Sequence, residues 1–129
     1  RTAPLAMFDY LDFGKVRDVS ATTHAHPVAE WSCVTLCDML WAIRNSSTPA
    51  KVDFWRRYGH IVSRPVEAVK SDGYCEHTLE AALWCFMNTG YMQTAAVAGA
   101  LAGVYYGFEA IPPKWVGRLR GKAVIDQCI

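Results

Sequence analysis

The 129-residue sequence lacks an excess of charge of either sign, a long apolar run and the alternation that marks strands. Thirteen Lys and Arg residues stand against twelve Asp and Glu residues, which leaves a net charge of +1 and no long basic run. Nucleic-acid binding draws on many clustered cations, so the sequence predicts no nucleic-acid partner. The longest weakly polar run, 94–108, is shorter than the roughly 20 residues that span a bilayer, and we expect no membrane span.

The five cysteines include no CxxC pair, and no GxSxG, P-loop or GxGxxG motif occurs. Cys33 and Cys37 lie four residues apart in an apolar helical pattern, which favours reduced core thiols over a disulfide framework. The opening residues RTAPLAMF show none of the features of a secretory signal. We therefore expect a cytoplasmic location.

Apolar residues at spacings of three and four are abundant, and they predict an all-α fold, a small helical bundle. The length suits one domain over 1–129. The hydrophobic content of 52% and the mean hydropathy of +0.06 are high for so small a domain, which favours an apolar surface that meets a partner. The helices are expected over 2–14, 15–21, 27–45, 50–64, 78–89, 94–110, 113–119 and 122–129.

Two of these helices have a clear predicted inner face. Leu5, Phe8 and Leu11 would face inward from 2–14, and a broad stripe that includes Trp31, Val34 and Met39 would do so from 27–45. The five tryptophans recur at helical positions beside aliphatic residues, so core packing explains them better than a stacking platform.

Small residues recur at every fourth position between 95 and 107, and they form a stripe: Ala95, Gly99, Gly103 and Gly107. Glycine inside a helix costs about 0.5–1 kcal/mol relative to alanine. Close packing of helix backbones would offset that cost, and the close approach of a ligand is the alternative.

His24, His26 and Glu30 form the one HxH pattern with a carboxylate nearby. Zinc would need a third or fourth ligand, which the spacing does not supply, so the pattern favours one histidine that caps the helix from Pro27 and one that is exposed. We expect no metal site.

A thiol nucleophile from Cys33 or Cys37 with His24 is disfavoured, because an apolar helix raises the pKa of a thiol. The carboxylate pairs Asp9 with Asp12 and Asp72 with Glu76 are expected to be solvated surface pairs, since nothing apolar near them separates their pKa values.

Four segments together resemble the C-terminal half of the ADP-ribosylglycohydrolase family: RTAPLAMF, THAHPVA, DGYCEHTLEAALWCFMNTG and AAVAGALAGVYYGFEAIPPKWVGRLRGKAVIDQCI. They occur in the family's order and cover nearly the whole chain. The resemblance implies a longer all-α fold that hydrolyses ADP-ribosyl linkages with a pair of Mg²⁺ or Mn²⁺ ions. It also maps a substrate-side histidine of that family onto His24.

Departures from the family concern its metal ligands. A phosphate-contacting loop and a first acidic cluster precede the RTAPLA segment in the family, and the sequence starts at Arg1, so we expect both to be missing. The second acidic cluster is an Asp-x-Asp-Thr loop, and an ungapped alignment puts Gly90 and Met92 in place of its two Asp residues. A gapped alignment implies that a helix and this loop are lost after Thr89. Magnesium needs several oxygen ligands, so no metal cofactor is expected.

The leading hypothesis is a catalytically inactive, truncated relative of the ADP-ribosylglycohydrolases, a pseudoenzyme that acts through binding or self-association. We expect a homodimer, with exchange of helices between copies if His77 to Tyr106 form one rod rather than a hairpin that turns at Gly90. One alternative is residual hydrolysis of ADP-ribose-type substrates with metal ligands from another chain. Another is a pocket at the dimer interface for a nucleotide-like small molecule.

Overall fold

A computed structural model describes residues 1–70, 72–89 and 98–120. These residues form α-helices and short 3-10 helices without a strand, which confirms the all-α fold. None of the helices described is both long and apolar enough to cross a bilayer. The elements are η1 (Ala3–Met7), α1 (Phe13–Ala21), α2 (Pro27–Asn45), α3 (Ala50–Val62), η2 (Val66–Ala68), α4 (Cys75–Asn88), α5 (Ala98–Tyr106), η3 (Phe108–Ala110) and α6 (Pro113–Val116).

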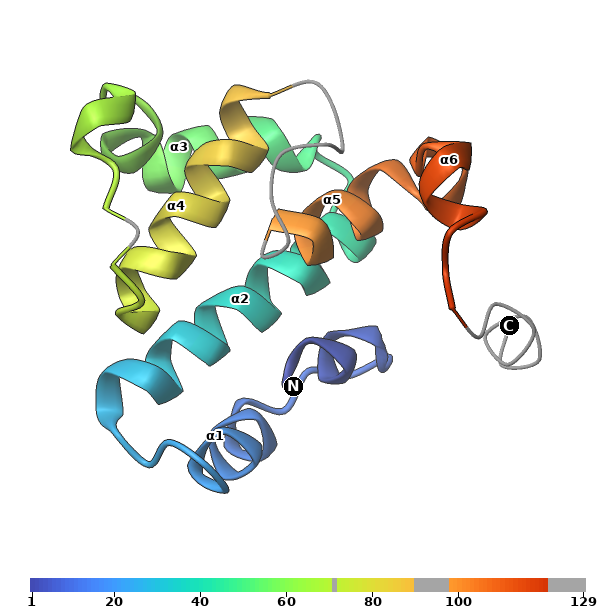
Figure 1. Cartoon of the computed structure of the whole chain (residues 1–129). Helices are drawn as coiled ribbons and strands as arrows, with labels where there is room; N and C mark the ends of the chain where they lie inside the picture. The colour runs from blue at the N-terminus through green and yellow to red at the C-terminus, as the bar shows by residue number, and fades with distance from the viewer. Residues whose placement is uncertain (71, 90–97, 121–129) are drawn as a thin grey trace.

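Helix α2 is the centre of the bundle. It packs against η1 and α1 on one side and against α4 and α5 on the other, and α3 packs on α4 (Figure 1). The largest fully buried side chains come from α1 to α5 and join the layers: Val16, Cys37, Met39, Leu40, Phe54, Leu83 and Leu101. Burial of these apolar groups is the main force that holds the helices together.

The predicted bounds of α2 agree with the structure at both ends. Pro27 stands in its first turn, and the side chain of His26 caps the helix by accepting the Val28 N–H at 3.3 Å. The prediction that Trp31 faces inward is wrong, because Trp31 is 59% exposed. The guanidinium of Arg17 from α1 lies 4.9 Å from the centre of its ring, outside the core that Val34 and Met39 enter.

The predicted N-terminal helix is too long. Only Ala3–Met7 is helical, the backbone of Phe8 is extended, and the Phe8 side chain is 65% exposed rather than buried. Asp12 explains the break, because its carboxylate accepts the N–H groups of Gly14 at 2.9 Å and Lys15 at 3.2 Å. A residue that caps the next helix in this way takes an extended backbone and cannot continue the preceding one.

Helices α4 and α5 pack against each other, which rules out the continuous rod. Thr89 directly after α4 is extended, and the ring of Phe86 lies 5.3 Å from the ring of Tyr105. A rod would separate these two residues by almost 30 Å at 1.5 Å per residue. The hairpin is the alternative that remains. Gly90, at which the hairpin was expected to turn, lies outside the described residues. The helix expected over 122–129 lies outside them too.

The glycine stripe does not act as predicted where the structure describes it. A Cβ atom added to Gly99 would meet nothing within 4 Å, so close backbone packing does not explain this glycine. The buried face of α5 consists of Ala98, Leu101 and Ala102 instead. Gly107 has φ +76°, and its N–H donates to the carbonyl of Gly103 at 3.0 Å. It therefore ends α5 as a left-handed residue.

Candidate functional site

A cavity of about 660 Å³ lies among the N-terminal residues, α1, α2 and the start of α4, and we call it the α1–α2–α4 cavity. This volume is within the usual range for a small-molecule site. The lining residues are Arg1, Thr2, Val19, Ser20, Thr23, His24, His26, Ala29, Ser32, Cys33, Leu36, Gly73, Tyr74, Cys75, Thr78 and Leu79. The cavity is therefore built mainly from the segments on which the family resemblance was noted.

The lining of this cavity is rich in hydrogen-bond donors and carries positive charge. Arg1 is its one residue with a permanent charge, and its guanidinium also donates to the hydroxyl of Thr22 at 3.3 Å. Hydroxyl groups on several sides can donate or accept, and no Asp or Glu is among the lining residues described. These groups suit a ligand that is anionic and has several polar atoms.

Two helices begin at the α1–α2–α4 cavity. Residues of the first turns of α2 and α4 line it, among them Ala29 and Thr78. The first N–H groups of a helix have no partner within the helix, and the aligned peptide dipoles place partial positive charge there. Helix N-termini are therefore suited to phosphate and carboxylate groups. In α4 the residue before the helix, Tyr74, makes no side-chain capping bond that would occupy these N–H groups.

The structure confirms the expectation for the two histidines. His26 caps α2, and His24, which the family resemblance marks as a substrate-side residue, is exposed. Both line the α1–α2–α4 cavity. The Nδ1 atom of His26 accepts the Val28 N–H at 3.3 Å, so this nitrogen is not available to a metal ion.

The two thiols of α2 have different surroundings. Cys37 is fully buried, and its Sγ–H donates to the carbonyl of Thr2 at 3.3 Å. Burial raises the pKa of the Cys37 thiol above its usual value, as expected, so this group stays protonated and unreactive. Cys33 lines the cavity together with His24 and Cys75, and no hydrogen bond joins any of these thiols to a histidine among the residues described.

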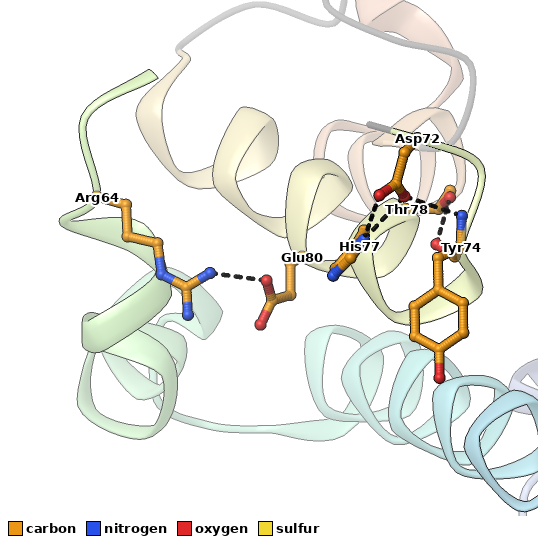
Figure 2. Close-up of polar contacts among 6 residues, drawn as sticks. All are labelled: Arg64, Asp72, Tyr74, His77, Thr78 and Glu80. Carbon is orange, nitrogen blue, oxygen red and sulfur yellow. Dashed lines mark hydrogen bonds and ion pairs between the residues drawn. The ribbon is translucent and has the colours of Figure 1, made fainter. Parts of the chain in front are cut away.

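Residues at the start of α4 were missed from the sequence because the helix begins at Cys75 and not at Thr78. Gly73 has φ +85°, and Asp72 accepts the backbone N–H of Tyr74 at 3.1 Å, so this turn directs the chain into the helix. In Figure 2 the ring of Tyr74 points toward α2, and its centre lies 5.2 Å from that of the His77 ring, which contacts it edge to face. The sequence showed the turn at Asp72-Gly73, but it did not show that Gly73 and His24 line the same cavity.

The four carboxylates of the expected surface pairs lie at the surface: Asp9, Asp72 and Glu76 are exposed, and Asp12 is partly exposed. His77 Nδ1 contacts both carboxylate oxygens of Asp72 at 2.8 and 3.0 Å. This hydrogen bond and the one from the Tyr74 N–H lower the pKa of the Asp72 carboxyl below its usual value. Asp9 pairs with Arg44, and Asp12 caps α1.

Metal ligands of the resembled hydrolases are not assembled in the part of the chain that the structure describes. No group of three His, Cys, Asp or Glu side chains there has the geometry to hold an ion. The two positions that an ungapped alignment assigns to the family's Asp residues, Gly90 and Met92, lie outside that part. The described residues do not fit a pair of Mg²⁺ or Mn²⁺ ions.

Comparison with known proteins gives matches to one family. A family model described as ADP-ribosylglycohydrolase matches residues 89–129. The ADP-ribosylarginine hydrolase Tri1 of Pseudomonas putida (strain GB-1) is 33% identical over 76 residues, which cover 47% of this chain and 20% of that protein. The Tri1 protein of Serratia proteamaculans (strain 568), of the same name, is 28% identical over 130 positions, 78% of this chain and 34% of that protein. The chain thus matches only 20% and 34% of the length of these two relatives, and no solved structure gives a significant match.

Proposed function

From the matches to the ADP-ribosylglycohydrolase family model and to the two hydrolases, we propose that the chain is a catalytically inactive helical module of this family that binds a nucleotide-like small molecule. The binding site is the α1–α2–α4 cavity. One observation carries the proposal: Arg1 and the N-termini of α2 and α4 surround a cavity whose described lining has no carboxylate. A ligand with a diphosphate, such as ADP-ribose, can accept hydrogen bonds there from Arg1 and from the first N–H groups of α4.

His24 and the hydroxyl groups serve the rest of the ligand in this proposal. His24 is exposed at the cavity, where its ring can stack on or hydrogen-bond to a base or a ribose. Thr2 and Ser20 are nearly buried at its floor, 4% and 6% exposed, which gives a polar surface with little freedom to move. The curated relatives are named for hydrolysis of ADP-ribosylarginine, and ADP-ribose is the part of such a substrate that this cavity suits.

We propose that the chain is catalytically inactive because an ungapped alignment puts Gly90 and Met92 at the positions of two metal-binding Asp residues of the family. Glycine has no side chain and methionine has a soft thioether, so Gly90 and Met92 cannot bind a hard cation. The cationic lining of the α1–α2–α4 cavity would also repel a divalent ion. We therefore propose that no metal cofactor takes part in binding.

Calorimetric titration with ADP-ribose tests the proposal. A charged hydrogen bond contributes about 1.5–3 kcal/mol, so Arg1→Gln should weaken binding about tenfold or more, while EDTA should leave it unchanged. Arg56→Gln is the matched control, because Arg56 is exposed on α3 away from the cavity. Equal affinities of Arg1→Gln and Arg56→Gln for ADP-ribose, or no binding at millimolar ADP-ribose, would contradict the proposal.

A second candidate is hydrolysis with metal ligands supplied by another chain. It is favoured by the alignment of the Serratia relative, a hydrolase by name, over 78% of this chain. Release of ADP-ribose from an ADP-ribosylated arginine peptide with Mn²⁺ present would support it. An inactive module gives no release and no change of melting temperature with the metal.

We also propose that the inactive module forms a homodimer and that it is located in the cytoplasm. Many large apolar side chains are exposed, among them Phe8, Tyr10, Trp55 and Phe108. Surfaces of this kind are often covered by a partner. Light scattering after size exclusion at micromolar concentration should give twice the chain mass of 14.4 kDa, and a monomer would contradict the dimer.

A further inference from the structure

A second cavity, of about 370 Å³, lies between α2, α3 and α4, and we call it the α2–α3–α4 cavity. It adjoins the first cavity, since Ser32 and Leu79 line both. Its walls are mostly apolar, with Met39, Ile61 and Leu83 among them. Neither the family resemblance nor the proposed function uses it.

The charged groups at this cavity are carboxylates. Glu76 and Glu80 of α4 line it, and no Lys, Arg or His is among its described lining residues. Glu80 accepts a hydrogen bond from Arg64 at 2.7 Å, and Figure 2 shows the two side chains facing each other. Glu76 is exposed and has no ion pair among the residues described. The cavity therefore has the opposite charge character to the α1–α2–α4 cavity.

Two aromatic side chains, Trp31 and Tyr58, complete the lining. Burial, with a smaller effect of nearby Asp38, raises the pKa of Tyr58, so its phenol is neutral at physiological pH. The Trp31 ring already receives a cation in this structure, the Arg17 guanidinium 4.9 Å from its centre. Cations are drawn to the electron-rich faces of such rings, and most strongly to tryptophan.

The lining also decides which kind of cation fits. A guanidinium or a primary ammonium needs several hydrogen-bond acceptors, and of the two carboxylates here that of Glu80 already accepts from Arg64 at 2.7 Å. Methyl groups on nitrogen need no acceptor and pack against aliphatic walls such as those of Met39 and Leu83. A methylated ammonium thus uses the apolar, aromatic and acidic parts of the lining together.

We propose that the α2–α3–α4 cavity binds a quaternary ammonium group, with Trp31 and Tyr58 against the methyl groups and Glu76 as the counter-charge. These three residues do not line the nucleotide site, although the two cavities share Ser32 and Leu79. Choline is the probe, and 3,3-dimethyl-1-butanol is its neutral analogue of the same shape.

Titration followed by Trp fluorescence and by the indole N–H signals in NMR spectra tests this site at constant ionic strength. Choline should bind about tenfold more tightly than the neutral alcohol and should shift the Trp31 signal, which the variant Trp31→Leu identifies by its loss. Glu76→Gln should weaken choline binding severalfold. Glu67→Gln is the matched control, since Glu67 is an exposed carboxylate on η2 outside the cavity.

Three results would overturn the proposal: equal affinity for choline and the alcohol, equal losses in Glu76→Gln and Glu67→Gln, or choline binding that survives Trp31→Leu. Circular dichroism shows whether each variant keeps its helices. ADP-ribose titration of Trp31→Leu separates the two sites, because this variant should lose choline binding and keep the nucleotide binding of the first cavity.

Discussion

The α1–α2–α4 cavity and the cluster around Lys51 both gather polar groups where helices meet, but they differ in how those groups are satisfied. The Lys51 cluster comprises Lys51, Phe86, Thr89, Tyr105 and Tyr106. Lys51 Nζ donates to the Thr89 carbonyl and to the Tyr106 hydroxyl, both at 3.0 Å. It also lies 5.0–5.6 Å from the centres of three aromatic rings.

In the cavity, by contrast, His24 and the first N–H groups of α4 face an open volume. Polar groups that are paired within the fold hold helices together, and polar groups that face a cavity can bind a ligand. The Lys51 cluster therefore stabilises the fold, whereas the cavity leaves polar groups free for the binding that we propose. Substitutions in the cluster should change unfolding, whereas substitutions at the cavity should change affinity.

The largest expected effect is that of Lys51→Met. This change leaves the Thr89 carbonyl and the Tyr106 hydroxyl without their donor and removes a cation from the end of α4, where it is favourable. We expect the free energy of unfolding to fall by about 2 kcal/mol. Urea denaturation followed by circular dichroism measures it.

Lys70→Met is the matched control, because Lys70 is exposed. It should change the free energy of unfolding by less than about 0.5 kcal/mol. If the two variants were equally stable, the Lys51 cluster would not be a stabilising centre and the comparison would fail. ADP-ribose affinity of folded Lys51→Met should stay as in the unchanged protein.

Two glycines, one inside α5 and one directly after it, should respond in opposite directions. Gly107, which follows Tyr106 of the Lys51 cluster, has φ +76° and ψ 175°, a backbone region that costs a residue with a Cβ atom roughly 1–3 kcal/mol. Gly107→Ala should therefore destabilise the fold by about 1 kcal/mol or more. Gly99→Ala should stabilise it by about 0.5–1 kcal/mol, since the new Cβ meets nothing within 4 Å. Thermal unfolding compares the pair, and destabilisation by Gly99→Ala would restore the close-packing interpretation.

Sequence patterns predicted the parts of the fold that depend on neighbouring residues. The bounds of α2 followed from Pro27 and from the apolar spacing, and its cap followed from His26. The same spacing was misleading for Phe8 and Trp31, because it shows that a residue is apolar but not whether another helix covers it. Packing partners that are distant in the sequence decide this, and one sequence does not reveal them.

The candidate site was predictable only in part. His24 was placed by its resemblance to a family motif, but Tyr74 joins it through the packing of α4 against α2, and Arg1 through the packing of η1 against α2. The Lys51 cluster gave no sequence signal at all. Its members come from three helices, and a lone lysine near the start of a helix usually points into solvent.

The smallest expected effect is the pH dependence that Asp72 adds next to the cavity. His77 and the Tyr74 N–H lower the folded-state pKa of the Asp72 carboxyl, so the ionised carboxylate of Asp72 stabilises the fold above the ordinary carboxyl pKa. This contribution decreases as the pH falls through the lowered pKa. The melting temperature of Asp72→Asn should therefore lie below that of the unchanged protein at pH 6, and the gap should narrow toward pH 3. Asp18→Asn, at an exposed position on α1, should show no such narrowing. A gap that is constant with pH would mean that Asp72 acts through its turn geometry alone, without a charge that matters to the start of α4.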